Sequence, residues 1–459
     1  MRTWALRSSW RVEPSREARL FRVAAALVIV FLLDDALGHP EPGTTAGDHL
    51  ISGTVPVAAV ALAAFAYPRL RPGLRATLAL VLGALAIVAG TVDGVAHAAV
   101  DRLAGDDATA ILAALAGGVL VGVGAATLWR TRRLDEPHLR RYLRRGAVGA
   151  AAVVLAAELL YPVGLSFVAT HPLRSPVRAA DLGRAYRPVA FTATDGMRLR
   201  GWYVPSRNGA AVIVFPGRRE AVVRHARVLV RHGYGVLLFD RRGEGQSEGD
   251  GNLFGWEGDK DLLAAIAFLG RQPDVRPSGI GGLGLSVGGE MLLQAAMEAP
   301  DLRAVVAEGA GTRSLREAMH EPGAGRWLPV GGAAFWTMAT TTTAVFSSHA
   351  PPPDLVDVVR RIGPRPLLFV YAEHSAAAGE DLNPRYYAAA RGPKELWRVD
   401  GAGHTGGLSA QPGEYERRVV AFFNRSLLRG TTTAEPGVSP VADRGLSGRA
   451  TAVDTRASR

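Results

Sequence analysis

Hydrophobic and polar positions are distributed differently in the two halves of this chain. Before about residue 170 the apolar residues form long, mostly uncharged runs, whereas after it short apolar runs alternate with helical patterns. Long apolar runs indicate membrane spans, and alternating strands and helices indicate a mainly parallel sheet covered on both faces. We therefore predict a transmembrane helical region over residues 1–170 and an α/β domain over residues 180–429.

The apolar stretches of the first half lie at residues 20–37, 51–67, 75–100, 109–129 and 146–169. A membrane span needs about 20 predominantly apolar residues. The first stretch is short and contains Asp34 and Asp35, so a cleavable signal peptide is the alternative there. The pattern predicts about five spans, or four if residues 20–37 do not cross.

The second half begins with two short runs, 188–193 and 197–204, on either side of the turn Asp195-Gly196, which predicts a β-hairpin. Buried strands are expected at 211–215, 235–239, 278–283, 366–371 and 395–399, and helices at 220–231, 256–270 and 288–299. The segment 311–362 is too long for a plain connection and predicts a helical cap inserted into the domain. Residues 430–459 lack any periodicity and are rich in Pro, Gly, Ser and Thr, which predicts a disordered tail.

The formal net charge of +11 is concentrated beside the apolar stretches, where arginines cluster at residues 2–22, 69–75 and 130–145. Basic residues that flank membrane spans mark the cytoplasmic side. The loop at 38–50 has no Arg or Lys, so five spans would place everything after residue 170 outside the cytoplasm. No aromatic residues accompany a basic face, so we expect membrane lipids as partners and no nucleic acid.

Cysteine is absent from the chain, which excludes disulfides, thiolate metal sites and a cysteine nucleophile. The histidines of the predicted cap, His320 and His349, lack metal-ligand spacing. We therefore expect no metal and no cofactor.

The clearest chemical motif is Gly284-Leu285-Ser286-Val287-Gly288, a G-x-S-x-G between a predicted strand and a predicted helix. A nucleophilic serine needs this spacing, because it lies on a sharp turn where side chains two residues away would collide. The position between strand and helix makes Ser286 the candidate nucleophile.

From about residue 186 to residue 428 the chain resembles the α/β hydrolases, in particular the serine-aminopeptidase and dienelactone-hydrolase-like branch. Beside the serine motif, three segments carry the resemblance: Phe215-Pro216-Gly217-Arg218, the turn at residues 240–249 that begins Asp240-Arg241-Arg242-Gly243, and Gly401-Ala402-Gly403-His404-Thr405. The resemblance implies a mainly parallel sheet with helices on both faces and a Ser-acid-His triad.

Within this resemblance His404 is the expected base, and the backbone N–H groups of Val287 and Arg218 are the expected oxyanion hole. The acid should follow the strand at 366–371 and precede His404. Glu380 is favoured because it lies four residues before a proline, with Asp381 and Glu373 as alternatives.

Two further expectations concern residues outside the triad. Asp240 ends a buried strand but precedes the nucleophile in the chain, so we expect it to cap nearby N–H groups or to pair with an arginine. The aromatic residues of the cap, Trp327, Phe335 and Trp336, are expected to line an acyl pocket, with packing onto the domain as an equal alternative.

Together these features predict a membrane-anchored serine hydrolase that cleaves small-molecule or lipid-like esters or amides through an acyl-enzyme. A non-catalytic ligand-binding or sensor protein on a hydrolase fold is the alternative, as is an acyltransferase that uses the same nucleophile. The substrate itself does not follow from the fold.

Overall fold

The computed structural model describes residues 14–96, 105–131, 137–172, 174, 177–215, 219–322, 332–374 and 379–428. Residues of the predicted tail at 430–459 lie outside this part of the chain.

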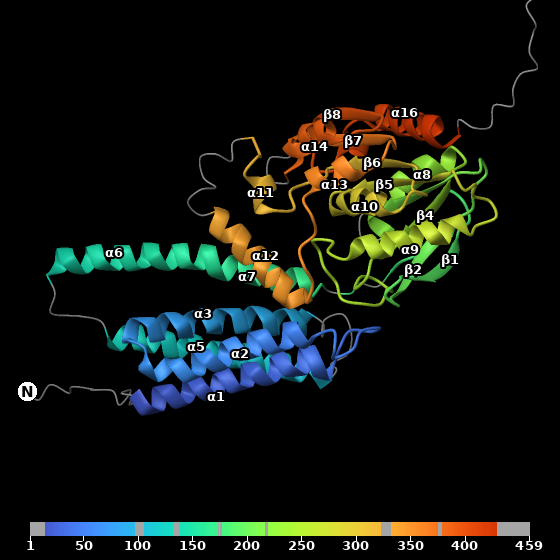
Figure 1. The fold of residues 1–459 in the computed structure, drawn as a ribbon. Helices are drawn as coiled ribbons and strands as arrows, with labels where there is room; N and C mark the ends of the chain where they lie inside the picture. The colour runs from blue at the N-terminus through green and yellow to red at the C-terminus, as the bar shows by residue number, and fades with distance from the viewer. Residues whose placement is uncertain are drawn as a thin grey trace, which may run out of the picture.

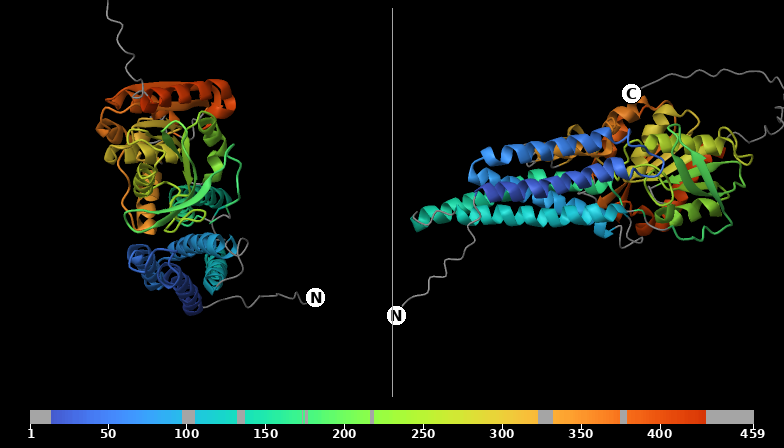
Figure 2. Two further views of the ribbon diagram at one scale, coloured as in Figure 1. Left: turned by 90° about the vertical axis from the view of Figure 1, so that its right-hand side faces the viewer. Right: turned by 90° about the horizontal axis from the view of Figure 1, so that it is seen from below.

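The first half of the chain is helical, as predicted. Its helices are α1 Pro14–Leu33, α2 Leu50–Ala66, α3 Pro72–Gly90, α5 Gly105–Arg130, α6 His138–Leu155 and α7 Tyr161–Thr170. α1, α2, α3 and α5 pack into a bundle, and the axis of α6 lies roughly along the axes of these helices (Figure 1). The α/β domain lies beyond one end of the bundle, the end opposite to the start of α1 (Figure 2).

Three described helical stretches are long and apolar enough to cross a membrane: Leu50–Arg69, Pro72–Gly94 and Ala108–Arg130. They coincide with the second, third and fourth predicted spans. α1 carries several charged residues in its first turns, and the fifth predicted stretch contains the shorter apolar helix Glu158–Thr170. The count of five spans stays a prediction.

Glycines allow α3 and α5 to approach each other closely. A Cβ atom at Gly83 would lie 2.7 Å from the carbonyl oxygen of Gly117, and one at Gly117 would lie 2.6 Å from that of Gly83. Small residues at such contacts are the usual means by which helices pack in a membrane, where the hydrophobic effect cannot drive them together.

The second half folds around one eight-stranded sheet with the strand order β1-β2-β4-β3-β5-β6-β7-β8. Its strands are β1 Arg187–Thr192, β2 Arg198–Val204, β3 Ala211–Phe215, β4 Gly235–Phe239, β5 Ile280–Leu285, β6 Ala304–Glu308, β7 Leu367–His374 and β8 Lys394–Gly403. β1 and β2 form the predicted antiparallel hairpin, and the strands from β4 to β8 are parallel. This is the α/β-hydrolase fold that the sequence predicts.

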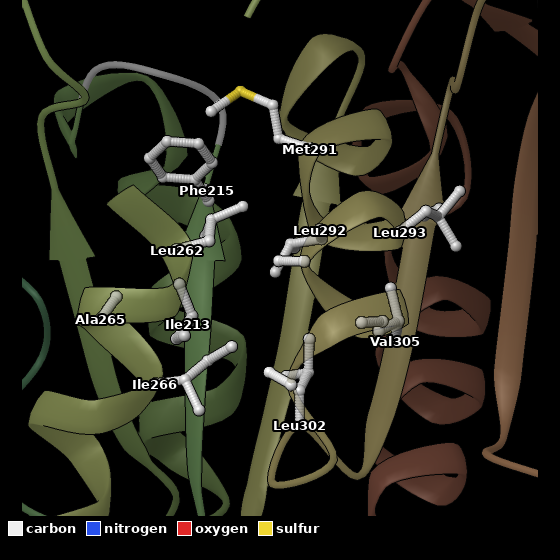
Figure 3. Packing of buried hydrophobic residues seen from close by; sticks show 14 of the residues in the cluster. Ile213, Phe215, Leu262, Ala265, Ile266, Met291, Leu292, Leu293, Leu302 and Val305 are labelled. Carbon is white, nitrogen blue, oxygen red and sulfur yellow. The ribbon is translucent and has the colours of Figure 1, made fainter. Parts of the chain in front are cut away.

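Helices cover both faces of the sheet. They are α8 Val223–Arg231, α9 Gly258–Gly270, α10 Val287–Glu298, α13 Leu355–Arg361, α14 Asn383–Ala389, α15 Gly407–Ala410 and α16 Pro412–Phe423. Figure 3 shows one of the two cores, in which Leu262 and Ile266 of α9 and Leu292 of α10 pack near Ile213 of β3. α8 and α16 contribute to the core on the other face.

The segment predicted as a cap contains α11 Leu315–Ala318 and α12 Ala333–Ser347 before α13. α12 packs against α7, at the junction with the helical first half of the chain (Figure 1). Ser166 of α7 donates a hydrogen bond to the carbonyl oxygen of Ala339 (3.0 Å) and accepts hydrogen bonds from Thr342 and Thr343. The cap therefore connects the α/β domain to the helical half.

Candidate active site

Ser286 lies on the turn between β5 and α10, at the carboxyl end of the sheet. Its φ of 53° and ψ of −127° fall in a region that L-residues rarely adopt. A Cβ atom at Gly284 would lie 2.4 Å from the carbonyl oxygen of Gly288, so a larger residue would not fit there. The motif therefore forms the strained turn that its spacing predicts.

His404 follows β8 directly, and its imidazole reaches across the carboxyl ends of the strands. The Nε2 atom of His404 lies 2.9 Å from Oγ of Ser286, although the two residues are 118 positions apart. The loop turns sharply after the histidine, because Thr405 has a φ of 50°.

Glu380 completes the arrangement on the far side of the imidazole. Its fully buried carboxylate forms a hydrogen bond with Nδ1 of His404. The same carboxylate accepts hydrogen bonds from the backbone N–H groups of Ala372 (2.6 Å) and Thr405 (3.3 Å). These donors fix the position of the carboxylate, so it can hold one orientation of the ring.

The other two candidate acids lie elsewhere. Asp381 is exposed to solvent. Glu373 accepts hydrogen bonds from Arg398 (3.2 Å) and from the backbone N–H of Gly401 (2.9 Å). Of the three acids considered from the sequence, the structure brings Glu380 to His404.

The hydrogen bond to Glu380 raises the pKa of His404 above its ordinary value of 6.5, and partial burial of the ring opposes this shift. A neutral imidazole in this position can accept the proton of the serine hydroxyl. The site thus combines a strained serine, a histidine within hydrogen-bond distance and a buried carboxylate, an arrangement that is chemically capable of nucleophilic acyl transfer.

A cavity of about 120 Å³ adjoins the serine turn and is lined by Val287 of α10 and by Trp336 of α12. Phe335, the neighbouring aromatic residue, does not line this cavity but stacks on Tyr161 of α7 with 5.6 Å between ring centroids. Trp327 and Arg218 lie outside the described residues.

Asp240 has the structural role predicted for it. Its carboxylate accepts hydrogen bonds from the backbone N–H groups of Arg219 (3.1 Å) and Gln246 (3.2 Å), and it forms a buried ion pair with the guanidinium of Arg219 (2.8 Å). The carboxylate therefore stabilises the turn after β4.

Glu308, a buried carboxylate at the end of β6, was not predicted as a site residue from the sequence. It accepts hydrogen bonds from the hydroxyl of Tyr415 (2.6 Å) and from the backbone N–H of Gly407 (2.9 Å), three residues after His404. Burial raises the pKa of this carboxyl group. In the sequence, only its position at the end of an apolar strand could have marked Glu308 as a site residue. Its hydrogen-bond partners Gly407 and Tyr415 lie about a hundred residues further along the chain, so no local pattern links them to it.

The fold and the arrangement of these side chains define an α/β hydrolase. Residues 174–405 match the family model of X-Pro dipeptidyl-peptidase (S15 family), and the chain belongs to this family. The resemblance seen in the sequence motifs is thereby confirmed at the level of the fold and of hydrolase membership.

Curated relatives match the same half of the chain. The uncharacterized protein Rv2307c of Mycobacterium tuberculosis is 30% identical over 240 residues, which cover 51% of this chain and 78% of that protein. The uncharacterized protein YfhR of Escherichia coli K12 is 25% identical over 52% of this chain and 81% of its own length. Among solved structures, the esterase PF2001 of Pyrococcus furiosus is 22% identical, with a TM-score of 0.45 over 56% of this chain and 99% of that one.

Proposed function

We propose that this protein is a membrane-anchored serine hydrolase that cleaves ester or amide bonds through an acyl-enzyme, with Ser286, His404 and Glu380 as its triad. The observation that carries the proposal is the continuous line of contacts from Oγ of Ser286 through both ring nitrogens of His404 to the buried carboxylate of Glu380. Membership in a hydrolase family supports it.

In the proposed reaction, Oγ of Ser286 attacks the substrate carbonyl carbon while Nε2 of His404 takes the hydroxyl proton. The backbone N–H groups of Val287 and Arg218 are proposed to bind the oxyanion, with the N-terminus of α10 favouring the negative charge. His404 then donates the proton to the leaving group as the carbon–heteroatom bond breaks. Water attacks the acyl-enzyme by the same steps, which releases the acid and restores the serine.

We assign residues 1–170 to the membrane anchor and residues 180–429 to the hydrolase domain, which we place outside the cytoplasm. The placement is supported by contacts between the domain and the loop at 38–49, which contains no Arg or Lys. Gly249 donates its backbone N–H to the carbonyl oxygen of Pro42 (2.7 Å), and Arg174 pairs with Glu41 (2.9 Å). The arginines at 69–75 lie at the other end of α2, between α2 and α3.

The proposal is tested with a fluorophosphonate probe, which labels activated serine nucleophiles, applied to membranes that contain the full chain. The wild type should be labelled and Ser286→Ala should not. Ser278→Ala removes an exposed serine just before β5 and serves as the matched control, which should label like the wild type. Failure of the folded wild type to label would favour a ligand-binding protein on the same fold.

A further inference from the structure

An apolar groove lies between the helices α1, α2, α3 and α7 and the cap helix α12. Its volume is about 390 Å³, within the range of about 300–1,000 Å³ that is usual for ligand pockets. Among the described residues that line it, Thr342 alone has a polar side chain. Its apolar lining includes Val28, Val55, Leu82, Val163 and Val345. We call this space the bundle groove.

The bundle groove is elongated along the helices. Its lining extends from Val55 to Ala63 on α2 and from Leu78 to Ala89 on α3. At about 1.5 Å per residue these stretches are about 12 Å and about 16 Å long. Val55 and Val88 keep 46% and 38% of their surface exposed, so the groove is open to the surroundings of the bundle. Because α2 and α3 lie in stretches long and apolar enough to cross a membrane, the groove suits a single hydrocarbon chain that enters from the lipid.

A second, polar cavity adjoins the bundle groove at the junction with the α/β domain. Its volume is about 110 Å³, and we call it the junction cavity. The two spaces share five lining residues, Phe31, Leu32, Pro56, Phe167 and Phe346. An apolar space that continues into a polar one has the arrangement of the tail and the head group of an amphiphile.

The junction cavity is acidic. The titratable residues of its lining are four acids and three histidines, Asp35, Glu41, Asp93, Asp250, His39, His49 and His171. The part of the lining that the structure describes contains no arginine or lysine, although Arg174 pairs with Glu41 (2.9 Å). Against the effect of its burial, the interaction with Asp35 raises the pKa of His171 to about 10. Even with His171 and Arg174 positively charged, the four carboxylates leave an excess of negative charge.

Two of these carboxylates can be reached by a ligand in the cavity. The side chains of Asp35 and Asp250 are 30% and 25% exposed. The nitrogens of His171 and His49 that face them lie 3.6 Å and 3.7 Å away, which is beyond the usual length of a hydrogen bond. Burial raises the pKa of Asp250, and a positive charge next to it would offset the cost of that burial. Both carboxylates can therefore accept hydrogen bonds from a cationic group.

Charge decides which head group fits the junction cavity. A primary ammonium group carries the opposite charge and donates three hydrogen bonds. A hydroxyl head group donates one hydrogen bond and brings no charge. A phosphate or carboxylate head group would add a negative charge beside carboxylates that are already partly buried, which is unfavourable.

We infer that the bundle groove and the junction cavity together bind a single-chain membrane amphiphile with an ammonium head group. The tail lies in the bundle groove, and the head group lies beside Asp35 and Asp250. The inference adds a binding site in the helical half of the chain and does not depend on the proposed triad.

The inference is tested by protection of an introduced thiol, since the chain has no cysteine of its own. Ser52→Cys places a thiol in the lining of the junction cavity, and Gly73→Cys places one at the opposite end of the bundle as the control. The full chain in a neutral detergent is treated with N-ethylmaleimide in the presence of dodecylamine, dodecanol or dodecanoate. The three probes have the same chain length and differ in the charge of the head group.

We expect dodecylamine to slow the modification of Ser52→Cys, because only the unoccupied form exposes the thiol. At ten times its Kd the decrease in rate should be about tenfold. Dodecanol should protect less and dodecanoate least. None of the three should protect Gly73→Cys.

The contribution of the groove is tested by filling it in the Ser52→Cys background. Gly164 lines the bundle groove, and a Cβ atom there would meet only Val88, at 3.9 Å. Gly164→Leu should therefore occupy the space of the tail and abolish protection by dodecylamine. Gly118→Leu makes the same change on α5 at a position that does not line the groove, and it should leave the protection unchanged.

The contribution of the head group is tested in the same background with Asp250→Asn, which removes one of the two reachable negative charges. It should weaken protection by dodecylamine severalfold and leave protection by dodecanol unchanged. Asp301→Asn, at an exposed position outside the junction cavity, is the matched control and should change neither.

The outcomes are decisive even if Gly164→Leu does not fold, which its melting temperature would reveal, because Asp250→Asn tests the site separately. Absence of protection by dodecylamine, equal protection by all three probes, or stronger protection by dodecanoate overturns the inference. Protection that a folded Gly164→Leu protein retains, or that Asp250→Asn does not weaken, overturns it as well. None of these measurements uses hydrolysis, so a failure of the proposed function would not be mistaken for a failure of this site.

Discussion

At the scale of single residues, the relation between Glu380 and His404 determines how the site should respond to pH. Below its pKa the imidazole carries a second proton and cannot act as a base, so activity should rise as pH increases through that pKa. Because the hydrogen bond to Glu380 raises the pKa of His404, the rising limb should lie above pH 6.5.

Glu380→Gln removes the negative charge but keeps the size of the side chain. We expect kcat/KM for p-nitrophenyl acetate to fall by about 10⁴-fold, because an amide can hold the imidazole in the wrong tautomer. The residual activity should rise at a lower pH than in the wild type, since the interaction that raises the pKa of His404 is lost. Both effects are read from a pH profile of kcat/KM.

Asp381→Asn, which changes the exposed neighbouring acid, is the matched control and should keep the profile of the wild type. An active Glu380→Gln protein beside an inactive Asp381→Asn protein would contradict the assignment of the acid.

The three side chains that meet at the site were candidates from the sequence because local signals mark them, with Asp381 and Glu373 as alternatives to Glu380. Glycines surround Ser286, His404 follows a buried strand, and Glu380 lies at a fixed distance before a proline. Glu308 could not be found in this way. Its partners are distant in the chain, and only the folded structure brings Tyr415 to Glu308.

At the scale of elements, apolar runs bounded by turn residues predicted β3 and β4 to the residue, whereas other boundaries depended on tertiary context. The helix predicted from residue 256 begins at Gly258, because Glu257 has a φ of 63° and cannot be part of a right-handed helix. β5 continues to Leu285, two residues beyond the prediction, because Gly284 pairs with Phe215 of β3. Pairing partners of this kind are not visible in a local pattern.

The contact between α3 and α5 can be tested with two adjacent glycines. Gly117→Leu should push the helices apart, because even a Cβ atom there would lie 2.6 Å from the carbonyl oxygen of Gly83. Gly118→Leu makes the same chemical change at a position where a Cβ atom meets nothing within 4 Å. We expect a clearly lower melting temperature in detergent for Gly117→Leu alone, measured by thermal unfolding of the full chain. Equal melting temperatures for the two variants would contradict the close packing.

At the scale of the whole molecule, the α/β domain lies at the end of the helical bundle that carries the loop at 38–49. The turn between α2 and α3, with Arg69 and Arg71, lies at the opposite end. If the bundle crosses a membrane, the positive-inside rule places these arginines in the cytoplasm and the α/β domain on the other side. The arginines and the α/β domain lie at opposite ends of α2 whether or not α1 crosses the membrane.

The absence of cysteine makes this placement directly measurable, because any introduced thiol is the only one in the chain. Asp301→Cys places a thiol on the exposed surface of the α/β domain, and Gly73→Cys places one at the exposed start of α3, where a Cβ atom meets nothing within 4 Å. A membrane-impermeant maleimide should label Asp301→Cys on intact cells, whereas Gly73→Cys should react only after the cells are permeabilised. The reverse pattern would place the hydrolase domain in the cytoplasm, and labelling of both on intact cells would mean that α2 and α3 do not separate two compartments. Labelling by the fluorophosphonate probe in the same cells reports whether each variant has kept a folded site.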